Sequence, residues 1–184
     1  MTEKKIIIVV CWGNIHRSPI AEHFINKKIK ELGLQHKYIC ISRGIQGSRG
    51  LPPPKFPNLL GYEIESKAAM PSLVRYGIDL SKHEAKAVDK EIIEKASMVL
   101  AINEKVLSDP ENGLLAQFPE DNKKIILITE FVGKTNDLED LSGISDENKY
   151  DLSIDRINDL VNKSFLPLIS KIEGQKSSRK EFEK

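Results

Sequence analysis

Residues 6–22 read Ile-Ile-Ile-Val-Val-Cys-Trp-Gly-Asn-Ile-His-Arg-Ser-Pro-Ile-Ala-Glu, and this stretch decides the fold. The five β-branched residues 6–10 predict a short strand that is buried on both faces, as the strands of parallel sheets are. Cys11 follows the strand at once. Gly13 and Asn14 tolerate a positive φ, so the chain after Cys11 can form a tight loop whose backbone N–H groups point inward. The stretch therefore predicts a strand that ends in an anion-sized loop.

A helix is predicted directly after this loop. Ser18 has the side chain of an N-cap, and Pro19 suits the first helical position. Apolar residues then recur at helical spacing as far as Leu32, where Gly33 gives a stop signal. The N-terminus of this helix points its free amides and its positive dipole end at the loop.

The anion loop, residues 11–17, has the composition of a nucleophilic oxyanion site. Arg17 comes six residues after Cys11, and its planar guanidinium can hold phosphate through two parallel hydrogen bonds. Inward amides and a cation stabilise a thiolate, which is the reactive form of cysteine. A buried structural cysteine is the alternative interpretation, but it does not account for the Gly, Asn, Arg, Ser and Pro that surround Cys11.

Residues 11–22 resemble the signature of the low-molecular-weight protein tyrosine phosphatases, in which Cys, five residues, Arg and Ser follow the first strand. The resemblance implies hydrolysis of phosphotyrosine or another aryl phosphate through a cysteinyl-phosphate. Cys11 would be the nucleophile, and the Ser18 hydroxyl would stabilise the departing thiolate. The implied phosphate-binding residues are Trp12, Gly13, Asn14, Ile15, His16 and Arg17.

The fold expected from the pattern is a doubly wound α/β domain. Further strands are predicted at 38–42, 98–102 and 125–129, and helical patterns alternate with them. The resemblance implies a three-layer sandwich whose four-stranded parallel sheet has the order 2-1-3-4, with helices on both faces. The anion loop would then lie where the winding of the sheet reverses, which is where such folds bind ligands.

Length and composition are those of one ordinary globular domain. The 28 basic and 27 acidic side chains leave a net charge of +1, which argues against nucleic acid or an acidic membrane as the partner. No apolar run approaches the roughly 20 residues of a membrane span, and residues 1–5 do not resemble a signal peptide. Two cysteines form neither a disulfide framework nor a metal site. We expect a cytoplasmic monomer without a metal or cofactor.

We expect a single phosphatase domain over residues 1–173, with an insertion at about 47–62. The Gly- and Pro-rich composition of this region excludes a long helix or a central strand. We expect Pro52 to Tyr62 to shape the substrate entrance, with a neutral surface loop as the alternative. The last helix is predicted from Ser153 to Ile172, with a kink or break at Pro167. Residues 174–184 are charged and are expected to form a disordered tail.

The general acid has to come from a second segment. A departing alkoxide or phenolate needs a proton, and the family supplies it from an Asp-Pro-Tyr motif before the last helix. The corresponding zone, residues 135–143, matches best with Asp140 as the acid and Asp137 as the second choice. The proline and the aromatic residues of the motif are missing here, which predicts a more open or differently lined pocket. Taken alone, the zone could equally be an acidic surface loop.

The resemblance also implies two supporting residues. Ser42, at the end of the second strand, would hydrogen-bond to Asn14, and His83 would brace the anion loop through the same asparagine. A solvated serine and a surface histidine are the alternatives. Cys40 lies between isoleucines in the second strand, and we interpret it as a packing residue.

Three functions stay open at this point. The first is a phosphatase acting on a phosphotyrosine-containing protein or a small aryl phosphate, because Trp12 and Ile15 offer apolar walls to a flat ring. The second is an arsenate reductase of the same fold, which needs further cysteines, and none follows Cys40. The third is a catalytically weak phosphotyrosine-binding module.

His16 stands at a position of the anion loop where many relatives carry a second cysteine, so this loop has no second thiol that could form a disulfide with Cys11.

Overall fold

The computed structural model describes residues 3–133 and 138–181. Its centre is a four-stranded, fully parallel sheet in the order β2-β1-β3-β4. This is the order that the resemblance implied, so the predicted fold is confirmed. The strands are β1 (Lys5–Cys11), β2 (Tyr38–Gly44), β3 (Ala96–Ala101) and β4 (Ile125–Leu127).

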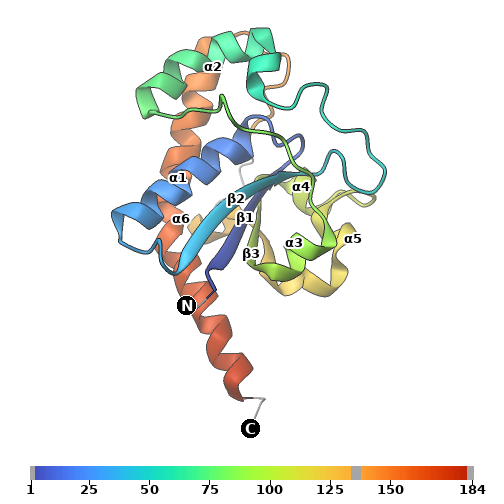
Figure 1. The fold of residues 1–184 in the computed structure, drawn as a ribbon, viewed down its shortest axis with the longest axis vertical. Coiled ribbons are helices and arrows are strands. Elements are labelled where there is room, and N and C mark those ends of the chain that lie inside the picture. The colour runs from blue at the N-terminus through green and yellow to red at the C-terminus, as the bar shows by residue number, and fades with distance from the viewer. Residues whose placement is uncertain (1–2, 134–137, 182–184) are drawn as a thin grey trace.

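Helices cover both faces of the sheet (Figure 1). On one face α1 and α6 pack together against the strands, and α2 packs against α6. The other face is covered by α3, α4 and α5 (Figure 1). The helices are α1 (Arg17–Glu31), α2 (Glu63–Tyr76), α3 (Lys90–Lys95), α4 (Glu104–Ser108), α5 (Leu114–Gln117) and α6 (Glu147–Glu181), with short 3-10 turns η1 (Leu59–Gly61), η2 (Pro119–Lys124) and η3 (Ile128–Val132).

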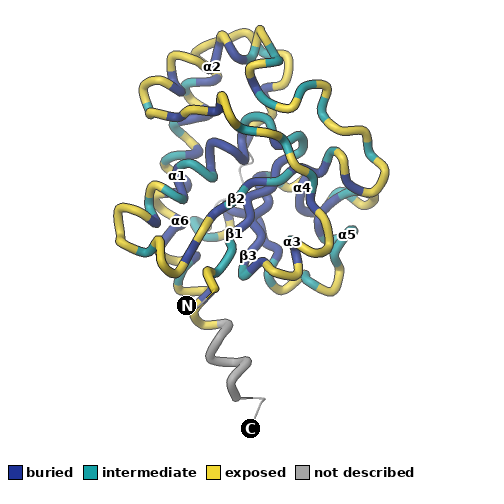
Figure 2. The backbone as a smooth tube through the Cα atoms, viewed as in Figure 1, coloured by how far each residue is buried: buried dark blue, intermediate teal, exposed yellow. Residues whose placement is uncertain are grey.

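Strand β1 forms the middle of the core. Residues 7–10 have no exposed surface, and Figure 2 shows buried backbone on both sides of them. Full burial of one aliphatic side chain of this size stabilises a fold by about 1.5–3 kcal/mol. Because β1 is fixed between β2 and β3, its last residue, Cys11, is held at the carboxyl edge of the sheet beside Gly44 of β2. The loop that follows lies where the strand order reverses, as predicted.

Two helices differ from the expected bounds. The sequence pattern predicts a short helix over residues 66–75, capped by Ser66 and closed by Gly77. α2 instead begins at Glu63, so that Ser66 is buried within the helix, while Gly77 does end it, with a φ of 67°. α6 runs through Pro167 to Glu181, and so includes most of the segment expected to be a disordered tail. Residues on both sides of Pro167, among them Phe165 and Leu168, are buried in the hydrophobic core, which opposes a break there.

No helix within the described ranges has the length and apolar character that crossing a membrane requires.

Gly44 provides a test of how tightly the anion loop is packed. A Cβ at this position would lie 3.0 Å from Cβ and 3.1 Å from the backbone N of Asn14. We expect Gly44→Ala to lower the free energy of unfolding by about 1–3 kcal/mol, because the loop backbone has no room to move aside. Urea unfolding measures this value.

Gly174→Ala is the matched control. Gly174 lies in α6, and a Cβ there meets nothing within 4 Å. Its replacement should therefore raise the free energy of unfolding by up to about 1 kcal/mol, since alanine is the better helix former. A Gly44→Ala variant as stable as the wild-type protein would contradict the packing argument.

Candidate active site

The sulfur of Cys11 receives two hydrogen bonds inside the anion loop. The backbone N–H of Asn14 donates to Sγ at 3.2 Å, and the Ser18 hydroxyl donates to it at 3.0 Å. Cys11 itself is buried at the end of β1. Both donors thus point at the sulfur that the sequence predicts to be the nucleophile.

Asn14 holds the loop in shape. Its φ is 56°, in the left-handed region that asparagine tolerates better than most residues. Its side-chain amide donates to the Ser18 hydroxyl at 3.0 Å, and its Oδ1 accepts from the backbone N–H of Lys86 at 2.9 Å. Nε2 of His83 lies 2.7 Å from its backbone oxygen, which is the contact that the resemblance implied for this histidine. Asn14 is thus fixed from both sides.

Ser42 does not make the contact expected of it. Its hydroxyl is buried and has no hydrogen-bond partner among the described residues. The Asn14 side chain bonds two other groups, since its NH₂ donates to Ser18 and its Oδ1 accepts from the backbone N–H of Lys86. The implied Ser42–Asn14 hydrogen bond is therefore wrong for this protein.

Ser18 also has a different role from the one that its position predicted. Helix α1 begins at Arg17, its N-cap position is His16, and no side chain caps it. The Ser18 hydroxyl lies instead beside Sγ of Cys11 and near the backbone oxygen of Arg43. The hydroxyl proton can therefore be donated to the sulfur or to this carbonyl, and the side chain does not cap the helix.

Arg17 joins the anion loop to the acid loop, residues 138–143. Its Nη1 donates to the backbone oxygen of Leu138 at 3.1 Å, and its Nη2 lies 2.9 Å from Oδ2 of Asp140. The guanidinium is buried, whereas the Asp140 side chain is 52% exposed. The structure thus brings Asp140 to the cysteine loop, while Asp137 lies outside the described residues.

The environment of Asp140 favours its ionised form. Partial burial acts to raise the pKa of this carboxyl, but the Arg17 guanidinium and two hydrogen bonds from Ser142 outweigh it. These bonds come from the Ser142 backbone N–H at 3.2 Å and its hydroxyl at 2.8 Å. The pKa of Asp140 is therefore held below its usual value, so Asp140 is a carboxylate while its partner is Arg17.

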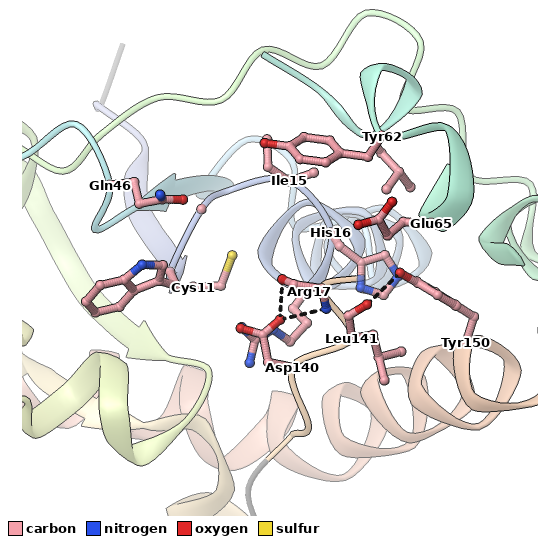
Figure 3. Close-up of a pocket in the computed structure, with 14 residues that line it drawn as sticks. Cys11, Ile15, His16, Arg17, Gln46, Tyr62, Glu65, Asp140, Leu141 and Tyr150 are labelled. Atoms are coloured by element: carbon pink, nitrogen blue, oxygen red, sulfur yellow. Dashed lines mark hydrogen bonds and ion pairs between the residues drawn. The ribbon is translucent and has the colours of Figure 1, made fainter. Parts of the chain in front are cut away.

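A pocket of about 110 Å³ opens over Cys11 (Figure 3). Its walls carry aromatic and aliphatic side chains from segments far apart in the sequence, including Leu59 and Tyr62 at the end of the Pro-rich segment. That segment therefore borders the entrance, as expected. Nζ of Lys105, on α4, lies 4.5 Å from the ring centre of Trp12 and steadies this wall. The lining residues are Cys11, Trp12, Gly13, Ile15, His16, Arg17, Gln46, Leu59, Tyr62, Glu65, Asp140, Leu141, Ser142 and Tyr150.

Residues 6–178 match the model of the family described as low molecular weight phosphotyrosine protein phosphatase. This protein belongs to that family. The low molecular weight protein-tyrosine-phosphatase Ptp of Acinetobacter johnsonii is 33% identical to it over 100 residues, which are 54% of this chain and 58% of that protein. A probable low molecular weight protein-tyrosine-phosphatase, EpsP of Ralstonia solanacearum, is 28% identical over 98 residues, 53% and 55% of the two chains. The chain thus spans little more than half the length of the curated relatives that it matches.

Solved structures resemble the whole domain. A low molecular weight protein tyrosine phosphatase from T. tengcongensis is 30% identical, with a TM-score of 0.68 over 90% of this chain and 100% of that one. The arginine phosphatase YwlE from Geobacillus stearothermophilus has a TM-score of 0.64 over 96% of each chain. At 23% identity the second comparison shows a shared fold and nothing more.

The two cysteines of this family member differ in environment. Cys40 is buried in the middle of β2, and burial, with the nearby Glu22 carboxylate, raises the pKa of its thiol well above the ordinary value. It is therefore the inert packing residue that the sequence indicated. Cys11 carries the two donors described above and opens into the pocket.

His16 lines the pocket as a neutral ring. Its Nε2 has almost no accessible surface and no hydrogen-bond partner among the described residues, and its ring packs edge-on against Tyr150 at 4.9 Å. Burial lowers its pKa from 6.5 to about 3, the Arg17 charge acts in the same direction, and Asp140 acts weakly against them. His16 therefore adds no positive charge to the phosphate site at neutral pH.

Several lining residues were not predicted. One of them, Gln46, lies in the loop after β2, another, Glu65, lies on α2, and the third, Tyr150, lies on α6. No local sequence motif marks any of the three. Tyr150 donates to the backbone oxygen of Leu141 at 2.9 Å, which fixes the acid loop on α6. The one available signal was the absence of the aromatic residues of the acid motif, which predicted a more open or differently lined pocket.

The neutral His16 makes stability depend on pH. Its pKa is lower in the folded than in the unfolded protein, so between about 3 and 6.5 the unfolded chain binds the proton and stability falls as the pH falls. Relative to pH 7, we expect the group to remove up to about 2 kcal/mol from the free energy of unfolding at pH 5. Urea unfolding at both pH values measures the loss.

The matched variants are His16→Asn and His36→Asn. The first should lose much less stability between pH 7 and pH 5 than the wild-type protein. The second removes an exposed ring beside the Gly33 carbonyl and should keep the wild-type pH dependence. The same pH dependence in His16→Asn and wild type would contradict the assignment.

Proposed function

We propose that this protein is a protein tyrosine phosphatase that hydrolyses phosphotyrosine, or another aryl phosphate, through a cysteinyl-phosphate. The observation that carries the proposal is the Cys11 sulfur, held by two donors inside a loop that Arg17 closes and ties to a carboxylate. The site has a nucleophile, donors for an oxyanion and an acid within one pocket.

The first step is attack of the Cys11 thiolate on phosphorus. A sulfur–phosphorus bond forms while the bond from phosphorus to the phenolic oxygen breaks, and Asp140 gives its proton to the departing oxygen. The loop amides and the Arg17 guanidinium hold the other phosphate oxygens. These groups supply the positive charge that a metal ion supplies in many other phosphoryl-transfer enzymes.

The Arg17–Asp140 ion pair explains how the acid acquires its proton. In the structure the guanidinium is 2.9 Å from Asp140 and keeps its pKa low. A bound phosphate competes for the same guanidinium and brings negative charge close to the carboxyl. Both changes raise the pKa of Asp140, because it loses a cation and gains an anion. Substrate binding therefore favours the protonated form that the first step needs.

The second step is hydrolysis of the cysteinyl-phosphate. Asp140, now ionised, takes a proton from water as the water oxygen attacks phosphorus, and the sulfur–phosphorus bond breaks to release the Cys11 thiolate. The Ser18 hydroxyl, 3.0 Å from Sγ, stabilises that thiolate. Inorganic phosphate leaves, and the enzyme returns to its starting state.

The pocket walls support an aromatic substrate. Trp12, Ile15, Tyr62 and Tyr150 line the pocket, and flat rings pack well against such side chains. An arsenate reductase has no support, since the chain has no cysteine other than Cys11 and Cys40, and the latter is buried. We also propose one domain over residues 1–173 with an insertion at 47–62, acting as a monomer in a reducing cytoplasm that keeps Cys11 free.

Replacing Asp140 tests the mechanism. We expect Asp140→Asn to lower kcat for a phosphotyrosine peptide by about 100-fold or more, since general acid catalysis contributes about 10²–10⁴-fold. The loss should be smaller for 4-nitrophenyl phosphate, whose leaving group needs a proton less. The bell-shaped pH dependence of kcat should also lose its high-pH limb. Steady-state rates without added metal, from pH 5 to 9, measure all three effects.

Two further variants are the controls for Asp140→Asn. Asp137→Asn should keep the wild-type rates, and a large loss there with an active Asp140→Asn would assign the acid to Asp137. Cys11→Ser should abolish turnover. Undetectable turnover by the wild-type protein, with retained phosphate binding, would overturn the proposal and favour a phosphotyrosine-binding module.

Oxidation should inactivate the enzyme irreversibly. Cys40 pairs with Ile7 in the sheet, four residues before Cys11, which is roughly 13 Å at about 3.3 Å per residue. A disulfide needs Cα atoms within about 7 Å, so Cys40 cannot protect Cys11. We expect dithiothreitol to recover little activity after heavy treatment with peroxide, because Cys11 passes on to the sulfinic acid.

His16→Cys is the matched variant for this prediction. It places a second thiol in the same pocket as Cys11, and so should make most of the lost activity recoverable through a disulfide. Full recovery of the wild-type enzyme by dithiothreitol would contradict the prediction.

A further inference from the structure

Glu65 places an unpaired carboxylate in the wall of a pocket built for an anion. It stands on α2, is half-buried, and lines the pocket with Cys11 and His16. Its Oε1 accepts a hydrogen bond from the backbone N–H of Gly143 at 2.9 Å. Within the part of the chain that the structure describes, no side-chain cation lies within 4.0 Å of this carboxylate. The Asp140 carboxylate in the same pocket, by contrast, is paired with Arg17.

This arrangement is unfavourable for a substrate that carries only negative charge. A phosphate group over Cys11 and the Glu65 carboxylate repel each other in a pocket that water screens incompletely. Arg17 cannot relieve this repulsion, because it pairs with Asp140 in the structure and binds the phosphate in the proposed mechanism. His16 cannot relieve it either, since its ring is neutral. The missing cation has to arrive with the substrate.

We propose that Glu65 is a specificity residue that selects a cationic side chain, lysine or arginine, next to the phosphotyrosine of the substrate. The inference rests on the proposed phosphatase function and names the class of peptide on which it acts. The Gly143 N–H occupies one carboxylate oxygen and leaves the other for an ammonium or guanidinium group.

The surroundings of Glu65 fit such a side chain. Figure 3 shows its carboxylate between Tyr62 and His16, facing the pocket, with Gln46 on the opposite side of Cys11. A tyrosine ring face attracts a cation and packs against the aliphatic part of a lysine or arginine. The phosphate and the cation of one substrate would thus occupy the Cys11 end and the Glu65 side of the same pocket.

The test compares three phosphotyrosine peptides that differ only in the residue beside the phosphotyrosine, which is lysine, alanine or glutamate. We expect the wild-type enzyme to prefer lysine over glutamate by roughly tenfold in kcat/KM at low ionic strength. Glu65→Gln should lose this preference, and Glu65→Lys should reverse it. Glutamine keeps an oxygen that accepts from Gly143, so the variant removes the charge while retaining the hydrogen bond. High ionic strength should weaken the wild-type preference.

Glu63→Gln is the matched control. Glu63 lies two residues earlier on the same helix, is exposed, and pairs with Lys67 at 2.7 Å away from the pocket lining. This variant should keep both the wild-type preference and the wild-type rate on the alanine peptide. Turnover of the alanine peptide by the wild-type protein tests the phosphatase function itself. If that peptide is hydrolysed but the lysine-to-glutamate ratio is the same in wild type and Glu65→Gln, the Glu65 inference alone is overturned.

Discussion

The left-handed backbone of Asn14 is the constraint on which the site depends. At a φ of 56° the chain turns sharply enough for the Asn14 N–H to face the Cys11 sulfur, 3.2 Å away. This conformation costs energy for any residue with a Cβ, and it persists only when the surroundings fix it. Hydrogen bonds do so: Asn14 donates to Ser18 of α1, and it accepts from Lys86 and contacts His83 in the chain before α3. Segments distant in sequence thus hold one strained residue.

The charged groups of the pocket are linked through the guanidinium of Arg17. Arg17 is a buried cation in the pocket lining, and its guanidinium contacts both the Leu138 carbonyl and Asp140. In the proposed mechanism, a phosphate that binds this guanidinium leaves Asp140 beside an anion, so that Asp140 gains a proton more readily. His16 stays neutral throughout, and the Glu65 carboxylate has no cation of its own among the described residues. One guanidinium therefore couples phosphate binding to the supply of the proton.

The sequence predicts the parts of the site that local pattern determines. The strand, the anion loop and the pair of Cys11 and Arg17 could be predicted, because β-branched residues, positive-φ residues and a cation follow one another within residues 6–17. Asp140 required the family resemblance, since its ion pair with Arg17 is formed only by tertiary folding. Ser18 was misread as a helix cap because cap propensity is local, whereas its bond to sulfur depends on how β1 meets α1.

The lining of the pocket shows why the remaining residues could not be predicted. The acid loop lacks the aromatic residues of the family motif, which led to the expectation of a more open or differently lined pocket. The structure supplies rings from two other places, Tyr62 after the Pro-rich segment and Tyr150 on α6. The Tyr150 hydroxyl also binds the Leu141 carbonyl, so this ring positions the acid loop as well as lining the pocket.

The family motif carries the acid and the aromatic wall in one segment, whereas in this protein the Asp140 carboxylate and the aromatic rings come from different segments. The Asp140 carboxylate is held by Arg17 and Ser142. The aromatic walls that stand in for the missing motif residues come from α6 and from the chain just before α2, next to Glu65. A change in the segment 47–62 or in α2 can therefore alter which substrate fits without moving the Asp140 carboxyl. If the proposed phosphatase function holds, we therefore expect the insertion and α2 to influence substrate preference in addition to the anion loop, whose Trp12 and Ile15 also line the pocket.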